Sequence, residues 1–359
     1  MLISYKYRLY PNREQRKTID FTTERCRLLY NRLLDERIHA YREEGKSLTY
    51  YDQANTFSER KAAIPALKQV HSQLLQDVAK RIDKAFQAFF RRVKAGEKPG
   101  FPRFKPATQY NSFTYPQGGY KLELNKLTLS KIGDVKIKLH RPVEGKIKTC
   151  TIIQKNGNYY ACLSAEVEPK QLPQCTDAVG VDLGVKMLAV TSDGEYFESP
   201  AYLRKSEKRL KRLQRSVSRK KKGGNRRKKA IRVLARLHEH VANQRKDYAH
   251  KVSRQFVNRY GLIAFEDLNV LGMVKNHHLA KSIIDSGWSQ LVAFTSYKAE
   301  SAGRVVKQVD PRHTSQLCSN CGQIVNKQLK DREHHCPYCG FVADRDENAA
   351  VNILKRATA

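Results

Sequence analysis

The stretch that decides the fold is Val179-Gly180-Val181-Asp182-Leu183-Gly184-Val185. It lies in an apolar run from Ala178 to Val190, which predicts a buried strand, a turn and a second strand. An unpaired buried charge is so costly that a carboxylate in such a run is normally paired or bound to a metal. Gly180 and Gly184 allow close approach of backbone or ligand. Asp182 is therefore either a strand-end residue that caps a turn or a metal ligand.

Two further acidic residues occur in comparable settings. Glu266 follows the short apolar run 262–265, and Asp346 lies at the predicted start of a helix near the end of the chain. Because adjacent strand residues face opposite ways, only one of Glu266 and Asp267 can face the same centre as Asp182. Asp346 is either a cap residue, favoured by the helix dipole, or the third member of an acidic cluster. Clustered acids repel one another, so their natural occupant is cationic.

The composition indicates a polyanionic partner. The chain has 359 residues, enough for two or three domains, and 68 Lys and Arg against 35 Asp and Glu give a net charge of +33. Self-repulsion on that scale is unfavourable unless a polyanion neutralises it, with nucleic acid as the first candidate and an anionic membrane as the second. The sequence shows no signal-peptide core and no apolar stretch of membrane-spanning length, so we expect a cytoplasmic protein without a membrane partner.

Basic residues concentrate between Leu203 and Lys229, where almost no acid compensates them. A solvated helix face is one interpretation of this segment. We favour a ridge that follows phosphates in a salt-dependent way, and a long helix continuing to about Tyr260. The candidate nucleic-acid-binding residues of this ridge are Arg219, Lys220, Lys221, Lys222, Arg226 and Arg227.

The first half of the chain alternates between strand and helix patterns. Residues 1–12 predict a short strand, residues 13–99 predict helices, and short alternating segments after residue 100 predict a small β-barrel. The barrel is thus interrupted by a helical insertion. In the last of these helices, residues from Leu75 to Val93 recur at steps of three and four, and we expect its aromatic residues to pack in the core.

The eight cysteines fall into two groups. Cys318, Cys321, Cys336 and Cys339 form two CxxC pairs separated by 14 residues, a spacing that suits one structural, tetrahedral Zn²⁺. His334 and His335 are alternative ligands, although we expect them to be exposed loop residues, and a zinc-free redox pair is a further alternative. The scattered residues are predicted to be buried free thiols: Cys26, Cys150, Cys162 and Cys175.

Several motifs together resemble one family, the TnpB (OrfB) proteins of bacterial and archaeal insertion sequences. The resemblance extends along the whole chain. Its residues are Gly180-Val181-Asp182-Leu183-Gly184, Phe265-Glu266-Asp267-Leu268, Thr314-Ser315-Gln316, Asp344-Arg345-Asp346-Glu347-Asn348-Ala349-Ala350, Arg8-Leu9-Tyr10-Pro11 and Gly100-Phe101-Pro102-Arg103-Phe104.

The resemblance implies an RNA-guided DNA endonuclease, related to the type V CRISPR effectors, with a transposon-derived guide RNA and double-stranded target DNA as partners. It implies a multidomain α/β and β fold: a wedge β-barrel (1–12 and 100–176), a helical recognition domain (13–99), an RNase H-like (RuvC) nuclease (177–312 and 343–359) and an inserted zinc ribbon (313–342). Asp182, Glu266 and Asp346 become the catalytic residues, holding two Mg²⁺ ions or their substitute Mn²⁺. Tyr50 and Gln76 become candidates for reading a short DNA motif beside the target.

Three other functions remain open at this point. They are a catalytically silent RNA-guided DNA-binding protein, a DNA-strand-joining transposase or its accessory factor, and a nuclease that cuts a specific sequence without a guide. The resemblance also implies a bacterial or archaeal cytoplasmic protein that associates with the nucleoid when it acts on DNA.

Overall fold

The computed structural model of the protein describes residues 1–328 and 331–359. Residues 329 and 330, which belong to the predicted zinc ribbon, lie outside the described part. The chain divides into two compact units, Met1–Glu168 and Pro169–Ala359. Among the described residues, no helix has both the length and the apolarity needed to cross a membrane.

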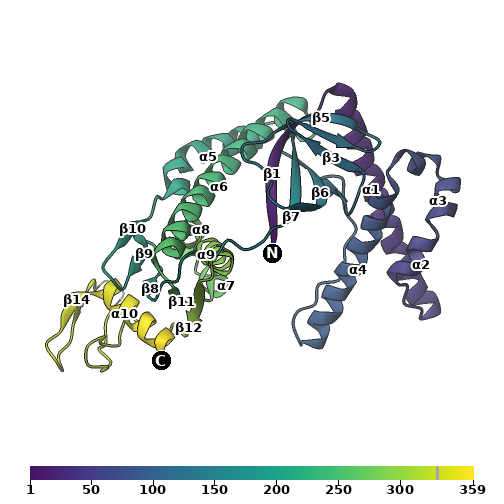
Figure 1. Ribbon diagram of the computed structural model, residues 1–359. Coiled ribbons are helices and arrows are strands. Elements are labelled where there is room, and N and C mark those ends of the chain that lie inside the picture. The colour runs from purple at the N-terminus through teal and green to yellow at the C-terminus, as the bar shows by residue number, and fades with distance from the viewer. Residues whose placement is uncertain (329–330) are drawn as a thin grey trace. The chain divides into compact units, whose positions relative to one another are not determined.

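The first unit combines a sheet with a group of helices (Figure 1). Its elements are β1 (Leu2–Tyr10), α1 (Arg13–Glu44), α2 (Tyr50–Asn55), α3 (Phe57–Ala63), η1 (Pro65–Gln69), α4 (Ser72–Lys94), β2 (Ser112–Tyr115), β3 (Tyr120–Glu123), β4 (Lys126–Leu129), β5 (Gly133–Lys138), β6 (Lys146–Lys155) and β7 (Asn158–Glu166).

The second unit contains a mixed sheet with helices on both faces. Its elements are β8 (Ala178–Asp182), β9 (Met187–Thr191), β10 (Tyr196–Glu198), α5 (Tyr202–Ser218), α6 (Asn225–Arg259), β11 (Leu262–Glu266), α7 (Val270–Met273), α8 (His277–Ser286), α9 (Trp288–Ala302), β12 (Val305–Val309), β13 (Glu333–His335), β14 (Val342–Asp344) and α10 (Arg345–Thr358).

The sheet of the first unit is antiparallel, with strand order β2-β6-β7-β1-β5-β4-β3. Its edge strands approach each other: the rings of Tyr115 in β2 and Tyr120 in β3 lie 6.4 Å apart, and the Tyr115 hydroxyl donates to the carbonyl of Ser130. No ladder joins β2 to β3 within the described residues. The predicted barrel is thus a strongly curved sheet whose edges are linked by side chains.

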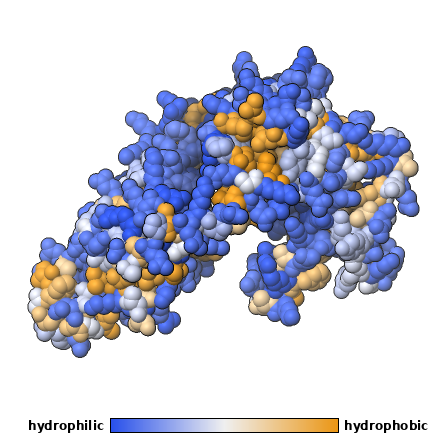
Figure 2. Space-filling view, in the orientation of Figure 1, coloured by the Kyte–Doolittle hydropathy of each residue, from blue (hydrophilic) through white to orange (hydrophobic). Residues whose placement is uncertain are grey.

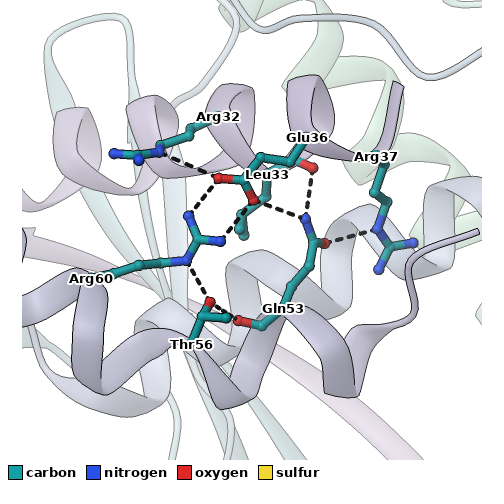
Figure 3. Close-up of polar contacts among 7 residues, drawn as sticks. All are labelled: Arg32, Leu33, Glu36, Arg37, Gln53, Thr56 and Arg60. Atoms are coloured by element: carbon teal, nitrogen blue, oxygen red, sulfur yellow. Dashed lines mark hydrogen bonds and ion pairs between the residues drawn. The ribbon is translucent and has the colours of Figure 1, made fainter. Parts of the chain in front are cut away.

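A partly buried polar network fastens α2 and α3 onto α1 (Figure 3). The Arg60 guanidinium donates to both carboxylate oxygens of Glu36, at 2.6 and 2.7 Å. The Gln53 amide donates to the carbonyl of Leu33 and accepts from Arg37, both at 2.8 Å. Because charged and amide groups bury only when they are satisfied, this network fixes the position of α2.

Helix α4 is buried over only part of its length. Leu75, Val78 and Ile82 pack in the core, as predicted, because they share one face of the helix. Phe90 is 58% exposed, and the partly exposed Phe89 contacts Phe101 in the lining of a cavity of 830 Å³. The prediction that all the aromatic residues of this helix pack in the core is therefore wrong for its last two turns, which extend past the sheet.

The sheet of the second unit has strand order β10-β9-β8-β11-β12. Strands β8, β11 and β12 are parallel, and β9 runs antiparallel to β8. Side chains alternate between its faces. One face packs against α6 and α9, through residues that include Val181 and Phe265, whereas Ala264 packs against α10.

Gly180 permits the close contact between α10 and β8. A Cβ atom at this position would lie 2.0 Å from the backbone oxygen of Ala350 and 2.6 Å from the backbone nitrogen of Leu354. Only glycine leaves room for the helix backbone there. The prediction of a close backbone approach at Gly180 is thus confirmed.

The basic segment is a helical hairpin and not one continuous ridge. Helices α5 and α6 pack on each other, and the loop between them, residues 219–224, contains Gly223 with a φ of +82°. A positive φ costs glycine little, so the turn falls at this position. Helix α6 then continues to Arg259, and the chain leaves it at the predicted Tyr260-Gly261.

Candidate active site and metal centre

Asp182 and Glu266 come to the same edge of the second unit's sheet. Strands β8 and β11 are parallel, and Phe265 pairs with Val181, so the next residues along each strand are Glu266 and Asp182. Both point to the same face of the sheet as Gly180, and a side chain at Gly180 would point towards α10. The carboxylates therefore lie on the α10 face. Asp267 is exposed, as expected for a residue that faces the opposite way.

Helix α10 brings Asp346 to the same face. Its contacts with Gly180 come from Ala350 and Leu354, and Asp346 lies one turn before Ala350. The cap of this helix is Asp344, whose carboxylate accepts from the backbone of Asp346 at 2.8 Å. Asp346 is consequently not the cap residue, which removes that alternative. We call Asp182, Glu266 and Asp346 the acidic cluster.

Electrostatics join the members of the acidic cluster. Burial, followed by the neighbouring Glu266 and Asp346 carboxylates, raises the pKa of Asp182 well above its ordinary value. Burial also raises the pKa of Glu266, which is 7% exposed, while a hydrogen bond from Thr314 and the charge of Arg356 act in the opposite direction. Burial therefore favours the protonated forms of Asp182 and Glu266 unless a cation compensates their charge.

Two guanidinium groups partly neutralise the cluster. Asp346, whose side chain is 17% exposed, pairs with Arg345 at 2.9 Å and with Arg332 at 3.6 Å. Asp182 has no hydrogen bond or ion pair through its carboxylate within the described part of the chain, so it is not the turn-capping residue of the first interpretation. In these residues, no direct hydrogen-bond or ion-pair partner therefore offsets the repulsion between Asp182 and the neighbouring carboxylates.

The four cysteines of the CxxC pairs form one compact cluster. Their sulfur atoms all lie within 4.8 Å of one another, and no other group of three or more His, Cys, Asp or Glu ligand atoms is this compact in residues 1–328 and 331–359. The Sγ atoms of Cys318 and Cys339 are 3.7 Å apart, and those of Cys321 and Cys336 are 3.5 Å apart. These distances are too long for disulfides and close to the ~3.8 Å expected for four sulfurs at ~2.3 Å from a tetrahedral ion.

Other predictions for histidines and cysteines are only partly correct. His334 is fully buried in β13, where its Nδ1 contacts the Lys327 ammonium, so its prediction as an exposed loop residue is wrong. His335 is exposed, as predicted, and neither histidine joins the cysteine cluster. Of the scattered cysteines, Cys26 and Cys150 are buried, whereas Cys162 and Cys175 are partly exposed.

The candidate nucleic-acid-binding residues of the basic segment concentrate at the tip of the helical hairpin. Arg219, Lys221, Lys222 and Arg226 are exposed, while Lys220 donates to the carbonyl of Ser216. Helix α6 begins there without a side-chain cap and without an acidic residue in its first turn. The surface over α5 and α6 is largely hydrophilic (Figure 2).

Tyr50 and Gln76 each lie beside Lys80. The Lys80 ammonium is 5.5 Å from the centre of the Tyr50 ring, and the exposed Gln76 is one turn before Lys80 on α4. The polar network of Figure 3 holds α2, and hence Tyr50, in this position. The two candidates therefore belong to the same surface of the first unit.

Three residues around the acidic cluster were not predicted as functional. They are Thr314, Arg332 and Arg345. Thr314 donates from its hydroxyl to Glu266, and it lines a cavity of 270 Å³ together with Lys327 and Arg345. The sequence contained only weak signals for them, namely the Thr314-Ser315-Gln316 motif and an arginine adjoining Asp346.

Comparison with known proteins relates three parts of the chain to family models. Residues 162–277 match the model OrfB_IS605, described as "Probable transposase". Residues 288–353 match the Cas12f1-like TNB domain. Residues 1–46 match a helix-turn-helix model, OrfB_IS605 type, although they form one strand and one long helix here.

Two relatives align with nearly the whole chain. "Putative RNA-guided DNA endonuclease" from Streptomyces pristinaespiralis is 34% identical over 98% of this chain and 88% of its own length. "Putative RNA-guided DNA endonuclease InsQ" from Escherichia coli (strain K12) is 34% identical over 98% of this chain and 92% of its own length. A chain in the "Cryo-EM structure of the Cas12f1-sgRNA-target DNA complex" aligns with 99% of this chain and 100% of its own length, at 16% identity and a TM-score of 0.40.

Proposed function

The chain belongs to the TnpB (OrfB) family of insertion-sequence proteins, and from this membership we propose that it is an RNA-guided DNA endonuclease. Both nearly full-length relatives carry that description in their names. The observation that carries the proposal is the convergence of three acidic side chains from distant segments on one face of the sheet. Buried carboxylates that repel each other are typical of functional sites.

The acidic cluster would hold divalent cations, with Mg²⁺ as the first candidate and Mn²⁺ as its substitute. Carboxylate oxygens are the ligands that these cations prefer, and a bound pair would activate water and stabilise the leaving oxygen of a phosphodiester. The three carboxylates do not all lie within 4.8 Å of one another. A site for two divalent cations would not require all three carboxylates to reach the same ion.

The surrounding residues have separate tasks in this proposal. Asp182 and Glu266 lie at the ends of paired parallel strands, and the cost of burying their charge would favour a cation between them. Arg345 and Arg332 compensate Asp346. With Lys327, Arg345 also gives the adjoining cavity a cationic wall that could bind a phosphate of the strand to be cut. The acidic cluster takes one residue from the end of each of two strands and one from the final helix, an arrangement that supports an RNase H-like nuclease.

The proposed partners are a transposon-derived guide RNA and double-stranded target DNA. The net charge of +33 favours a polyanion, and the tip of the α5–α6 hairpin offers exposed cations beside an uncapped helix N-terminus. We assign binding of the nucleic-acid phosphate backbone to this tip. Tyr50 and Gln76 are assigned to the DNA motif beside the target, while base pairing with the guide reads the remaining sequence.

The cysteine cluster is assigned one structural Zn²⁺. Four thiolates leave no open position for water, so the ion would stabilise the fold of residues 313–342 and take no part in the chemistry. Gly322 and Gly340 permit the tight turns after each pair, with φ of +76° and +71°. The spacing of the sulfur atoms supports this assignment.

The proposal is tested with the protein purified together with its RNA. The co-purifying RNA is sequenced, and a plasmid carrying the matching target is incubated with the complex and Mg²⁺. We expect cutting that stops after ribonuclease treatment and that is absent with Asp182→Asn. Asp267→Asn is the matched control, because this neighbouring carboxylate is exposed on the other face.

Each alternative has its own outcome in this experiment. Binding of the target without cutting by the wild type would identify a catalytically silent binder. Cutting that survives ribonuclease would identify a guide-independent nuclease, and joined transposon ends would identify a transposase. Full cutting by Asp182→Asn would refute the role of the acidic cluster.

A further inference from the structure

A short segment before the cysteine cluster is fastened to α10 by two buried asparagines. The Asn352 amide donates to the carbonyls of Thr314 and Leu317, at 2.9 and 2.7 Å. The Asn348 amide donates to the same Leu317 carbonyl at 2.8 Å and accepts from the backbone of Ser319 at 2.8 Å. The two residues are four apart, so they lie on one face of α10.

Helix formation does not explain why asparagine occupies these two positions. Asparagine is a weak helix former, and its buried amide is costly unless it is hydrogen-bonded. Asn348 and Asn352 are 1% and 2% exposed, yet their side-chain hydrogen bonds go to another segment and not to their own helix. Both are therefore specific to the docking of residues 314–319.

The docked segment ends at the acidic cluster. Thr314 is buried, and its hydroxyl donates to the Glu266 carboxylate. No other hydrogen bond or ion pair reaches the Glu266 carboxylate among residues 1–328 and 331–359. At its other end the segment continues directly into Cys318 and Cys321. One run of residues thus touches both the candidate catalytic carboxylate and the candidate zinc site.

We propose that Thr314 is a positioning residue for Glu266, and that Asn348 and Asn352 couple it to the fold of the cysteine cluster. The proposal rests on the proposed function, because it assumes that Glu266 holds a divalent cation. The hydroxyl fixes one oxygen of the carboxylate, which would leave the other oxygen available to hold a cation in a defined orientation.

The test compares Thr314→Val with Thr314→Ser in the zinc-loaded, RNA-bound protein. Valine keeps the shape and removes the donor, and serine restores it. Loss of such a supporting hydrogen bond typically weakens a metal site by about 10- to 100-fold. We expect Thr314→Val to raise the Mg²⁺ concentration for half-maximal cutting by about that factor and to weaken Mg²⁺ binding in calorimetry similarly. Thr314→Ser should return both values to near those of the wild type.

The matched control is Thr295→Val. Thr295 is fully buried in the same unit, but its hydroxyl donates to the carbonyl of Leu291 in its own helix. Its loss should lower stability slightly and leave Mg²⁺ binding unchanged. The proposal would be overturned if Thr314→Val bound Mg²⁺ and cut DNA as well as the wild type does. It would also be overturned if Thr295→Val weakened Mg²⁺ binding by the same factor as Thr314→Val.

A second variant tests the coupling. Asn352→Leu should raise the half-maximal Mg²⁺ concentration as Thr314→Val does, and the double variant should be no worse than either alone, because all three break one connection. Additive effects would refute the coupling. The calorimetric readout separates this proposal from the proposed function. If the wild type binds Mg²⁺ in a way that depends on Glu266 and is weakened by Thr314→Val, but cuts no DNA, only the proposed function is refuted. A wild type without Mg²⁺ binding would remove both.

Discussion

The acidic cluster and the cysteine cluster are two candidate metal sites of the same unit, built in opposite ways. The cysteines lie between positions 318 and 339, and a tight turn follows each CxxC pair. The acids lie at positions 182, 266 and 346, and they meet only because two parallel strands and a helix pack correctly. A local site can be recognised from spacing, whereas a long-range site depends on the whole unit.

The two sites also differ in how they balance charge. The acidic cluster has Arg345 and Arg332 against Asp346, and burial raises the pKa of Asp182 and Glu266. Its cation should therefore be exchangeable with protons. The cysteine cluster is closed, so its ion should be part of the fold. The experiments below test this contrast, beginning with the largest expected effect.

Asp182→Asn should reduce cutting by about three orders of magnitude or more, because the metal supplies several kcal/mol and about 1.4 kcal/mol is tenfold.

The same change should raise the melting temperature of the Mg²⁺-free protein at pH 8 by a few degrees. The raised pKa means that the folded wild type binds more protons than the unfolded chain, so its stability falls as pH rises past the ordinary aspartate value. The asparagine side chain of the variant does not ionise, so the variant does not lose this stability as the pH rises.

Thermal melts of the wild type and Asp182→Asn at pH 4 and pH 8 measure this effect. The advantage of the variant should shrink towards pH 4, where the folded wild type is protonated. A variant less stable than the wild type at both values would show that Asp182 is a structural partner and not a repelled ligand. Asp267→Asn should change neither cutting nor melting appreciably.

Cys336→Ser should release the zinc and unfold residues 313–342 locally, since metal binding and folding are coupled at such sites. Zinc content by mass spectrometry of the intact protein should fall from one ion to none. Limited proteolysis should then cut within this range. Cys175→Ser is the control, because its hydroxyl can keep the hydrogen bond to the Arg259 carbonyl. Retained zinc with unchanged proteolysis would contradict the assignment.

Gly180→Ala should destabilise the second unit by about 1–3 kcal/mol, because the added methyl group would overlap the backbone of α10. Since α10 carries Asp346, cutting should fall in parallel, which would show how far the acidic cluster depends on packing. Denaturant unfolding measures the loss of stability. Gly224→Ala is the control, with ordinary backbone angles and no neighbour closer than 3.3 Å. Equal stability of both variants would mean that α10 shifts without cost.

Changing Arg219, Lys221 and Lys222 to glutamine should flatten the salt dependence of RNA binding by up to about three units of slope, one for each lost phosphate contact. Filter binding at several salt concentrations gives the slope. The control changes Lys17, Lys121 and Lys126, which each pair with an acid and carry less free charge. An unaltered slope would mean that the hairpin tip is only a solvated surface.

Much of the candidate site could be predicted from the sequence, because its signals are local. A carboxylate inside an apolar run, a glycine two residues before it and two CxxC pairs each carry their meaning within a few positions. Strand alternation predicted that only one of Glu266 and Asp267 could face the same centre as Asp182, and in the structure that residue is Glu266. The predictions that failed concern surroundings: the last turns of α4 extend past the sheet, His334 is buried, and the basic segment turns back at Gly223.

The sequence by itself thus determined which residue types could hold metal and nucleic acid, since these depend on chemistry and short spacing. Only the tertiary structure decided that Asp344, and not Asp346, caps α10, that Arg332 and Arg345 face the cluster, and that Thr314 reaches Glu266. These contacts join residues between 1 and 48 positions apart whose side-chain directions follow from packing. Packing depends on all the segments of the unit at once, so no single stretch of sequence contains it.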